Sequence, residues 1–285
     1  MKLVSFSFSY FFFCLFFLSS VAFGHMKSLH TAATGMAAQE AMVNTISHNI
    51  ANVNTHGFKR SRTEFEDLLY ENRTLAGARS SADTYFNVNT QFGSGVKVGA
   101  NRLEFTQGVP KITNNPFDLM IQGEGFLGMT LANGEIVFTR DGSFSLNPEG
   151  VLVTREGIPV FPGITIPANT QTISIAENGT VDCFLPNQTA PVSVGQIPVF
   201  VFVNPNGLLA LGGNKYQKSL TSGEPIQMTA GVEQAGVLKQ GMIENSNVNI
   251  LEEMTSLLRA QRSYELNSKV LGIADQMLGT INNVR

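Results

Sequence analysis

The chain has 285 residues, of which 43% are hydrophobic and 14% are charged, and its formal net charge is −3. This length accommodates one large domain or two smaller ones. This slightly negative net charge gives no strong electrostatic attraction to nucleic acid, so the composition does not favour a nucleic-acid-binding protein.

Residues 1–25 have the layout of a secretory signal peptide. Lys2 precedes an apolar core from Phe11 to Leu18, and Ala22-Phe23-Gly24 fits a small-x-small cleavage site. The apolar core is shorter than the ~20 residues that a membrane-spanning helix needs. Alternatively the stretch is an untranslated leader, because Met26 is a second possible start. On these residues alone both interpretations stay open.

The two cysteines are Cys14, inside this leader, and Cys183. A chain without the leader keeps one thiol, which excludes an internal disulfide. We expect Cys183 to be a small buried hydrophobe rather than a nucleophile. No later stretch of the sequence is apolar enough to span a bilayer.

Residues 28–54 predict a helix, within an N-terminal helical segment at 26–57. Its large side chains recur in alternating steps of three and four residues, the heptad step of a coiled-coil seam. Gly57 can take the left-handed conformation that closes a helix near Asn54. The predicted seam consists of Leu29, Ala32, Met36, Gln39, Val43, Ile46, Ile50 and Val53.

The C-terminal segment at 239–285 shows the same pattern over residues 247–282. Its seam consists of Ile250, Met254, Leu257, Gln261, Tyr264, Ser268 and Leu271, and continues loosely through Ala274, Leu278 and Ile281. An ordinary buried helix is the simpler interpretation of one such stripe. Two seams at opposite ends of one chain favour an antiparallel pair of terminal coiled-coil helices.

Between the helices, the sequence predicts an arm at 58–116 and a β-rich block at 117–238. Residues 58–73 form a short helix or an extended arm, and the polar stretch that follows, to about Gly95, is expected to be a long extended loop. A loop this long is unusual unless it lies against something else, such as a neighbouring subunit.

The block at 117–238 contains short alternating runs separated by turns. Asn133-Gly134 lies between two such runs and predicts a hairpin with a two-residue loop. The alternation predicts an all-β domain that resembles a barrel or sandwich. The fold class is therefore α+β, with this domain inserted between the paired terminal helices.

The sequence offers no catalytic, cofactor-binding or metal-binding constellation. Gly123, Gly125 and Gly128 match G-x-G-x-x-G, but a hairpin follows them where a dinucleotide site needs a helix, so we expect turns and close packing. None of the four histidines is paired at metal-ligand spacing. We expect a protein that is not an enzyme.

Several motifs resemble those of bacterial flagellar rod and hook proteins. The segment HNIANVNTHGFK at 48–59 is similar to the family's N-terminal signature, with His48 in place of its first Asn. Segments 120–126 and 138–144 are similar to its central β segments, and 246–249 and 261–265 to its C-terminal signature. The matching N-terminal residues are Asn49, Ala51, Asn52, Thr55, Gly57, Phe58 and Lys59.

The arm resembles that of the distal-rod branch of the family. Its matching residues are Phe65, Glu66, Asp67, Leu68, Leu69 and Tyr70. The resemblance implies a structural subunit that self-assembles into a hollow helical drive shaft, an open symmetry that needs two complementary faces on each copy. It further implies that the paired helices line the channel, the β domain forms the outer wall, and the arm binds neighbours and stiffens the tube.

The resemblance also implies the partners and the location. Besides copies of itself, these are proximal rod proteins and a hook or hook-adjacent protein at the two ends, a surrounding ring bushing, and the flagellar type III export apparatus. The location is the basal body, across the periplasm. Substrates of that apparatus normally lack a cleaved signal, which favours Met26 as the start. The alternative is a signal-bearing secreted β-domain binding module with a helical stalk.

Overall fold

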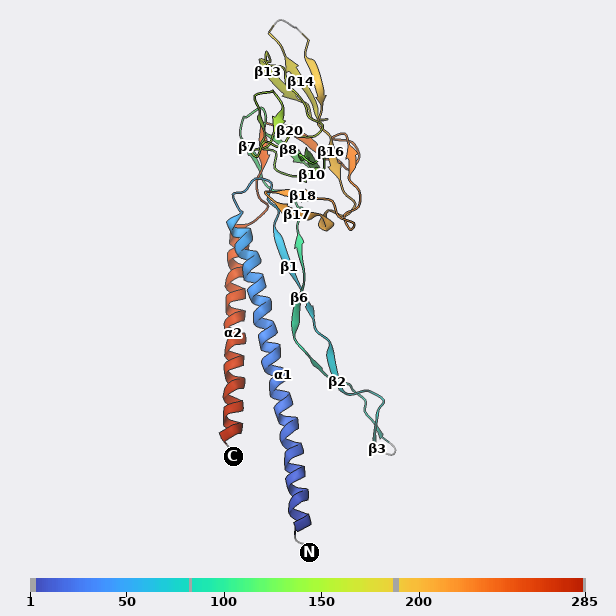
Figure 1. The fold of residues 1–285 in the computed structure, drawn as a ribbon, viewed down its shortest axis with the longest axis vertical. Helices are drawn as coiled ribbons and strands as arrows, with labels where there is room; N and C mark the ends of the chain where they lie inside the picture. The colour runs from blue at the N-terminus through green and yellow to red at the C-terminus, as the bar shows by residue number, and fades with distance from the viewer. Residues whose placement is uncertain (1–3, 82–83, 187–189, 284–285) are drawn as a thin grey trace. The chain divides into compact units, whose positions relative to one another are not determined.

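The computed structural model describes residues 4–81, 84–186 and 190–283. Two helices flank a β-rich middle region, so the fold is α+β (Figure 1). The chain divides into two units: one comprises residues 1–47, 62–102 and 251–285, and the other residues 48–61 and 103–250. The side chains of the predicted leader, residues 1–25, lie outside the described part of the chain.

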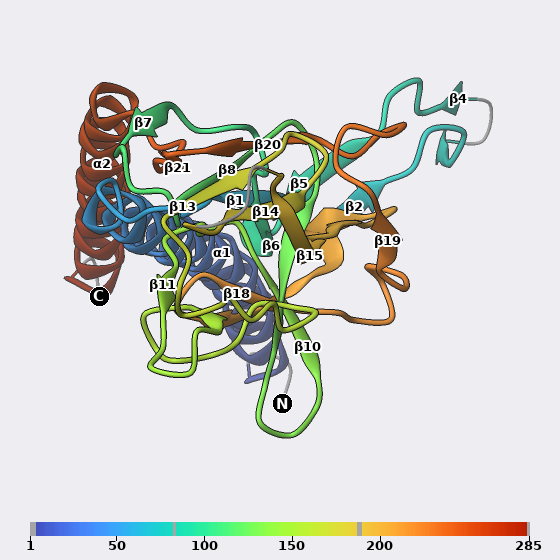
Figure 2. The same cartoon turned by 90° about the horizontal axis from the view of Figure 1, so that it is seen from above.

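The first unit contains both helices, α1 (Val4–Ala51) and α2 (Ile250–Asn283). They run side by side in opposite directions (Figures 1 and 2). They approach closely at Gly35, where an added Cβ would lie 2.9 Å from the side-chain nitrogen of Asn267. Among the described residues, neither helix is long and apolar enough to cross a membrane.

The buried line on α2 runs through small and polar side chains. Glu253, Ala260 and Ala274 are buried and Asn267 is half-buried, at intervals of seven residues that keep them on one face. The predicted positions Leu257, Leu271 and Leu278 are half-buried beside this line, whereas Ile250, Met254 and Tyr264 are about half exposed.

On α1 the predicted positions are buried to different degrees. Ile46 is buried, and Leu29, Met36, Val43, Ile50 and, beyond the helix end, Val53 are half-buried. Ala32 and Ala38 are also buried. Small side chains on both helices therefore occupy much of the buried surface, and the packing of the larger ones against other subunits stays a prediction.

The expected loop before Gly95 is wrong, because this stretch forms a ribbon of paired antiparallel strands. Strand β2 pairs β5, with Tyr70 opposite Gly93, and β1 pairs β6. Backbone hydrogen bonds, rather than apolar burial, hold the ribbon, so its polar composition concealed it. Its strands are β1 (Ser61–Asp67), β2 (Tyr70–Thr74), β3 (Arg79–Ser81), β4 (Thr84–Tyr85), β5 (Thr90–Gly93) and β6 (Val96–Leu103).

The second unit is built on a six-stranded sheet with the order β17-β18-β10-β9-β16-β19. A three-stranded sheet, β13-β14-β15, and the pairs β20-β8, β21-β7 and β11-β12 complete it. A barrel-like or sandwich-like closure of these sheets stays a prediction. Buried Cys183 lies on β14.

The strands of the second unit are short. They are β7 (Pro110–Ile112), β8 (Leu119–Gln122), β9 (Phe126–Thr130), β10 (Ile136–Thr139), β11 (Ser145–Leu146), β12 (Leu152–Val153), β13 (Thr172–Ile175), β14 (Thr180–Phe184), β15 (Val192–Gln196), β16 (Val199–Val201), β17 (Leu209–Gly212), β18 (Lys215–Gln217), β19 (Ile226–Met228), β20 (Val237–Gln240) and β21 (Met242–Glu244).

Strands β9 and β16 are buried on both faces. Leu127 and Val199 belong to an aliphatic cluster, whereas Phe126 and Phe200 belong to an aromatic one, because alternate residues of a strand face opposite sides. Gly128 leaves room for the Phe200 ring, which would lie 2.5 Å from an added Cβ. The glycines of the G-x-G-x-x-G match thus serve close packing.

The hairpin predicted at Asn133-Gly134 joins β9 to β10, but its loop is longer than expected. Ile136 pairs with Thr130, and the N–H of Leu131 donates to the carbonyl of Glu135. Gly134 has φ 82° and occupies the third position of a three-residue loop. The Asn-Gly pair therefore located the turn correctly, and the left-handed glycine follows a tight turn instead of forming its centre.

Truncating a buried side chain on β9 should lower the stability of the second unit. Leu127→Ala removes a fully buried side chain, so we expect the free energy of unfolding to fall by about 2–5 kcal/mol. Val203→Ala, at a residue that is 83% exposed, is the matched control and should change it by less than about 0.5 kcal/mol. Urea denaturation of both variants measures this, and equal effects would contradict the assigned core.

A buried polar joint formed by the two signature segments

The first signature segment turns the chain at the end of α1. The side-chain amide of Asn49, which is buried, donates to the carbonyl of Ser61 at 2.8 Å and accepts from the N–H of Ser61 at 2.9 Å. One side chain therefore satisfies both backbone groups of a residue twelve positions later. This fixes where the chain goes after the helix.

The turn between these residues requires glycine. Gly57 has φ 70°, and an added Cβ would lie 2.5 Å from the backbone nitrogen of Asp141. Its own N–H donates to the carbonyl of Glu244 at 2.8 Å. Upstream, the hydroxyl of Thr55 donates to the side chain of Asn52 at 3.2 Å. The turn thus brings its backbone against β21.

Beyond the turn, Lys59 points into the interior and meets a carboxylate. Lys59 and Glu244 have exposed fractions of 0% and 1%, and Nζ donates to Oε1 at 2.6 Å. The same ammonium donates to the carbonyl of Thr106 at 2.8 Å, and the N–H of Gly108 donates to the same carboxylate oxygen at 2.8 Å. A buried pair needs such extra hydrogen bonds to offset the loss of hydration.

A third buried charge lies on the other side of the carboxylate. Arg140, 4% exposed, has its Nη1 3.6 Å from Oε2 of Glu244 and donates to the carbonyl of Gly123 at 2.9 Å. Its guanidinium also lies over the ring of Phe126. Burial lowers the pKa of Lys59 from 10.5 to about 8, against the opposing effect of Glu244.

The C-terminal signature adds a second bridge through Asn247. Its side chain accepts from the N–H of Arg60 at 2.7 Å and donates to the carbonyl of Glu104 and the hydroxyl of Thr106, both at 2.8 Å. Segments 48–61, 103–109 and 244–247 thus form one cluster, which we call the joint.

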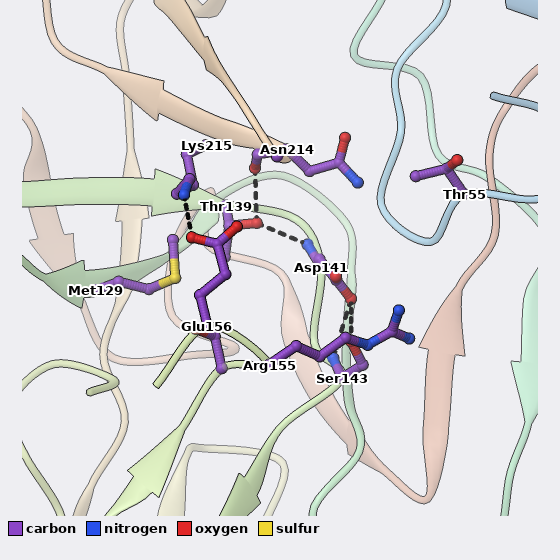
Figure 3. Close-up of a pocket in the computed structure, with 11 residues that line it drawn as sticks. Thr55, Met129, Thr139, Asp141, Ser143, Arg155, Glu156, Asn214 and Lys215 are labelled. Carbon is purple, nitrogen blue, oxygen red and sulfur yellow. Dashed lines mark hydrogen bonds and ion pairs between the residues drawn. The ribbon is translucent and has the colours of Figure 1, made fainter. Parts of the chain in front are cut away.

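A cavity of about 210 Å³ lies beside the joint within the second unit, lined by Thr55 and by other residues of that unit (Figure 3). Its polar groups bond one another: the hydroxyl of Thr139 donates to the carbonyl of Asn214 at 2.8 Å, and Lys215 pairs with Glu156. Asp141 accepts from both the N–H and the hydroxyl of Ser143, which is a local turn motif. These polar groups are therefore held by one another.

In the described ranges, no group of three or more His, Cys, Asp and Glu side chains is placed to hold a metal ion.

Sequence reasoning named part of the joint and missed the rest. It identified Gly57 and Lys59 by resemblance, but not their partners Glu244, Arg140 and Thr106. Glu244 lies two residues before the second signature and ends an apolar strand, which is the one signal that could have indicated it. The arm residues lie on and between β1 and β2, where Leu68 is half-buried and the others are exposed.

Comparison with known proteins places these segments in a flagellar context. The family described as flagellar basal body rod protein matches residues 29–59, the FlgE/F/G hook protein D1 domain matches 120–183, and the FlgEFG rod C-terminal family matches 239–284.

Flagellar rod proteins of other bacteria align with most of this chain. The flagellar basal-body rod protein FlgG of Buchnera aphidicola from Acyrthosiphon pisum is 44% identical, covering 91% of this chain and 100% of that protein. Those of Caulobacter vibrioides and Bacillus subtilis are 46% and 33% identical, each over 91% of this chain and over 100% and 99% of their own lengths.

Removing the carboxylate of the joint should be strongly destabilising. Glu244→Gln leaves the buried Lys59 ammonium without its counter-charge, so we expect unfolding to become easier by about 3–5 kcal/mol. Adding Lys59→Met should recover part of that loss. Glu224→Gln, which breaks an exposed pair with Lys218, is the control and should cost under ~1 kcal/mol. Thermal denaturation measures all three, and a mild effect of Glu244→Gln would contradict the pairing.

The lowered pKa of Lys59 predicts an alkaline pH dependence. Folded Lys59 loses its proton near pH 8, whereas unfolded lysine keeps it to about 10.5. Between these values the unfolded chain binds more protons, so this contribution to stability rises with pH, by roughly 2 kcal/mol from pH 8 to 9.5. Denaturant titrations of the wild type minus the Lys59→Met/Glu244→Gln double variant isolate it, and a flat or falling difference would refute it.

Proposed function

Because the chain belongs to the FlgG family of flagellar basal-body rod proteins, we propose that it assembles into the distal part of the rod as a hollow helical shaft that transmits torque from motor to hook. Its role is structural rather than enzymatic. The observation that carries this proposal is the joint, in which the two family signatures from opposite ends of the sequence meet around the pair of Lys59 and Glu244.

The exposed side of α2 supports assembly. Besides its buried line, this helix presents a second set of large apolar side chains that are each about half exposed in the single chain: Met254, Leu258, Leu266, Val270, Ile273, Met277 and Ile281. Soluble monomers rarely leave so much apolar surface on one helix. We propose that neighbouring copies cover it, with the helices forming a coiled-coil lining of the channel and the β-rich unit the outer wall.

The proposal includes the expected partners. Copies of this chain form the tube, proximal rod proteins and the hook or a hook-adjacent protein adjoin its ends, a ring surrounds it as a bushing, and the export apparatus delivers it. The ribbon of β1–β6 is the proposed stiffening arm. Its exposed residues Leu69, Tyr70 and Phe65 support a role in contacts with other subunits.

A deletion strain complemented with variants tests the proposal. Wild-type chain should restore the filament, and immunogold labelling should place it between motor and hook. Ile273→Asp/Met277→Asp puts charges on the exposed face of α2, so assembly and motility should fall at least tenfold while the denaturation of the β-rich unit stays unchanged.

Gln276→Asp, at an exposed polar position of the same helix, is the control and should retain motility. A complete distal rod in the deletion strain would overturn the proposed function.

A further inference from the structure

A second cavity, of about 540 Å³, lies within the first unit, between the two helices and the ribbon. Ala32, Val270 and Phe92 supply the apolar part of its lining. We call it the ribbon pocket. Its full lining is Lys27, Ser28, Thr31 and Ala32 of α1, Glu71, Arg73, Phe92 and Gly93 of the ribbon, and Asn267 and Val270 of α2.

The rim of the ribbon pocket carries an excess of positive charge. The ammonium of Lys27 donates to the carboxylate of Glu71 at 2.6 Å and to the carbonyl of Phe92 at 3.3 Å, so one cation is already paired. Arg73 lies with its guanidinium carbon 5.3 Å from the centre of the Phe92 ring. Within the described ranges Arg73 forms no direct ion pair, although its charge also acts on the Glu71 carboxylate, so one cation remains in excess. A suitable occupant is therefore apolar with an adjacent carboxylate.

This same chain presents such a group. Leu69, between β1 and β2, is 89% exposed. Leu68 is half-buried, and its N–H donates to the carbonyl of Gly95, so Asp67 and Leu69 on either side of it face outward together. Asp67 is exposed and lies near the Tyr70 hydroxyl, whose pKa it raises.

Other strongly exposed apolar residues fit less well. Leu220, which is fully exposed, lies beside the paired charges Lys218 and Glu224, so no carboxylate is left free for Arg73. Val203, at 83% exposure, has no charged residue next to it in the sequence. Of the large apolar side chains in the described ranges, Leu69 is thus the most exposed one that has a carboxylate, Asp67, within two positions of it.

We propose that Leu69 of one copy inserts into the ribbon pocket of a second copy, with Asp67 facing Arg73 of that copy. This rests on the proposed function and names the receiving site of the arm. Leu69 does not fill the pocket of its own chain, where it stays exposed. A projecting group and a receiving pocket on different surfaces of one chain give a heterologous contact, which builds an open polymer when the rotation between copies does not close a ring.

Mixed cysteine crosslinking in assembled rods tests this contact. Two differently tagged copies are co-expressed, one carrying Leu69→Cys and the other Val270→Cys, and isolated rods are oxidised mildly. We expect a disulfide-linked dimer with both tags, at least tenfold more abundant than from the control pair Leu220→Cys and Val270→Cys. Because each copy carries one introduced thiol, a band with both tags reports contact between chains.

Charge reversal is a second, independent test of this contact. Asp67→Arg should lower the yield of rods at least tenfold, since it places two cations together, and Arg73→Asp in the same chain should restore it. Both residues are exposed, so neither change disturbs a core. Assembled rods that give no mixed dimer and no rescue would overturn this contact alone. Absence of the chain from the basal body would instead overturn the proposed function.

Discussion

The second unit depends on one buried carboxylate that is shared by two cations. Glu244 accepts from Lys59 and from the N–H of Gly108, and Arg140 approaches its other oxygen. A buried carboxylate without partners is costly, so a structure in which these segments separate is strongly disfavoured. The pair of Lys59 and Glu244 therefore contributes less to stability than to specificity. It permits one arrangement of segments 48–61, 103–109 and 244–247, which are distant in sequence.

The arrangement explains why the signature needs its particular residues. Gly57 must be glycine because the backbone of Asp141 lies where a Cβ would be, and the Lys59 side chain extends to the carboxylate of Glu244. Asn247 then holds Arg60 and Glu104 in register. Each of these residues acts on the backbone of another segment, so the motif packs distant parts of the same chain together.

The sequence predicted those features that depend on local periodicity or on strict turn chemistry. The two terminal helices, the hairpin at Gly134 and the β-rich character of 117–238 belong to this class. It could not predict the ribbon, because Asn72 and Gln91 pair through backbone ladders that leave little mark on composition. Nor could it select the buried face of α2. Period alone favoured the larger Met254 over Glu253, whereas close helix approach at Gly35 favours small side chains such as Ala260.

The two hydrogen bonds of the Asn49 side chain at the joint require an amide, which offers one donor group and one acceptor oxygen. The Asn49 amide faces a carbonyl with its NH₂ group and an N–H with its oxygen, in a place without bulk water to adapt to a change. Hydrolysis of that amide to a carboxylate would keep the shape of the side chain. It would also place a carboxylate oxygen against the carbonyl oxygen of Ser61, so that two acceptors would face each other. Slow chemical ageing at this single buried side chain would thus loosen the turn after α1.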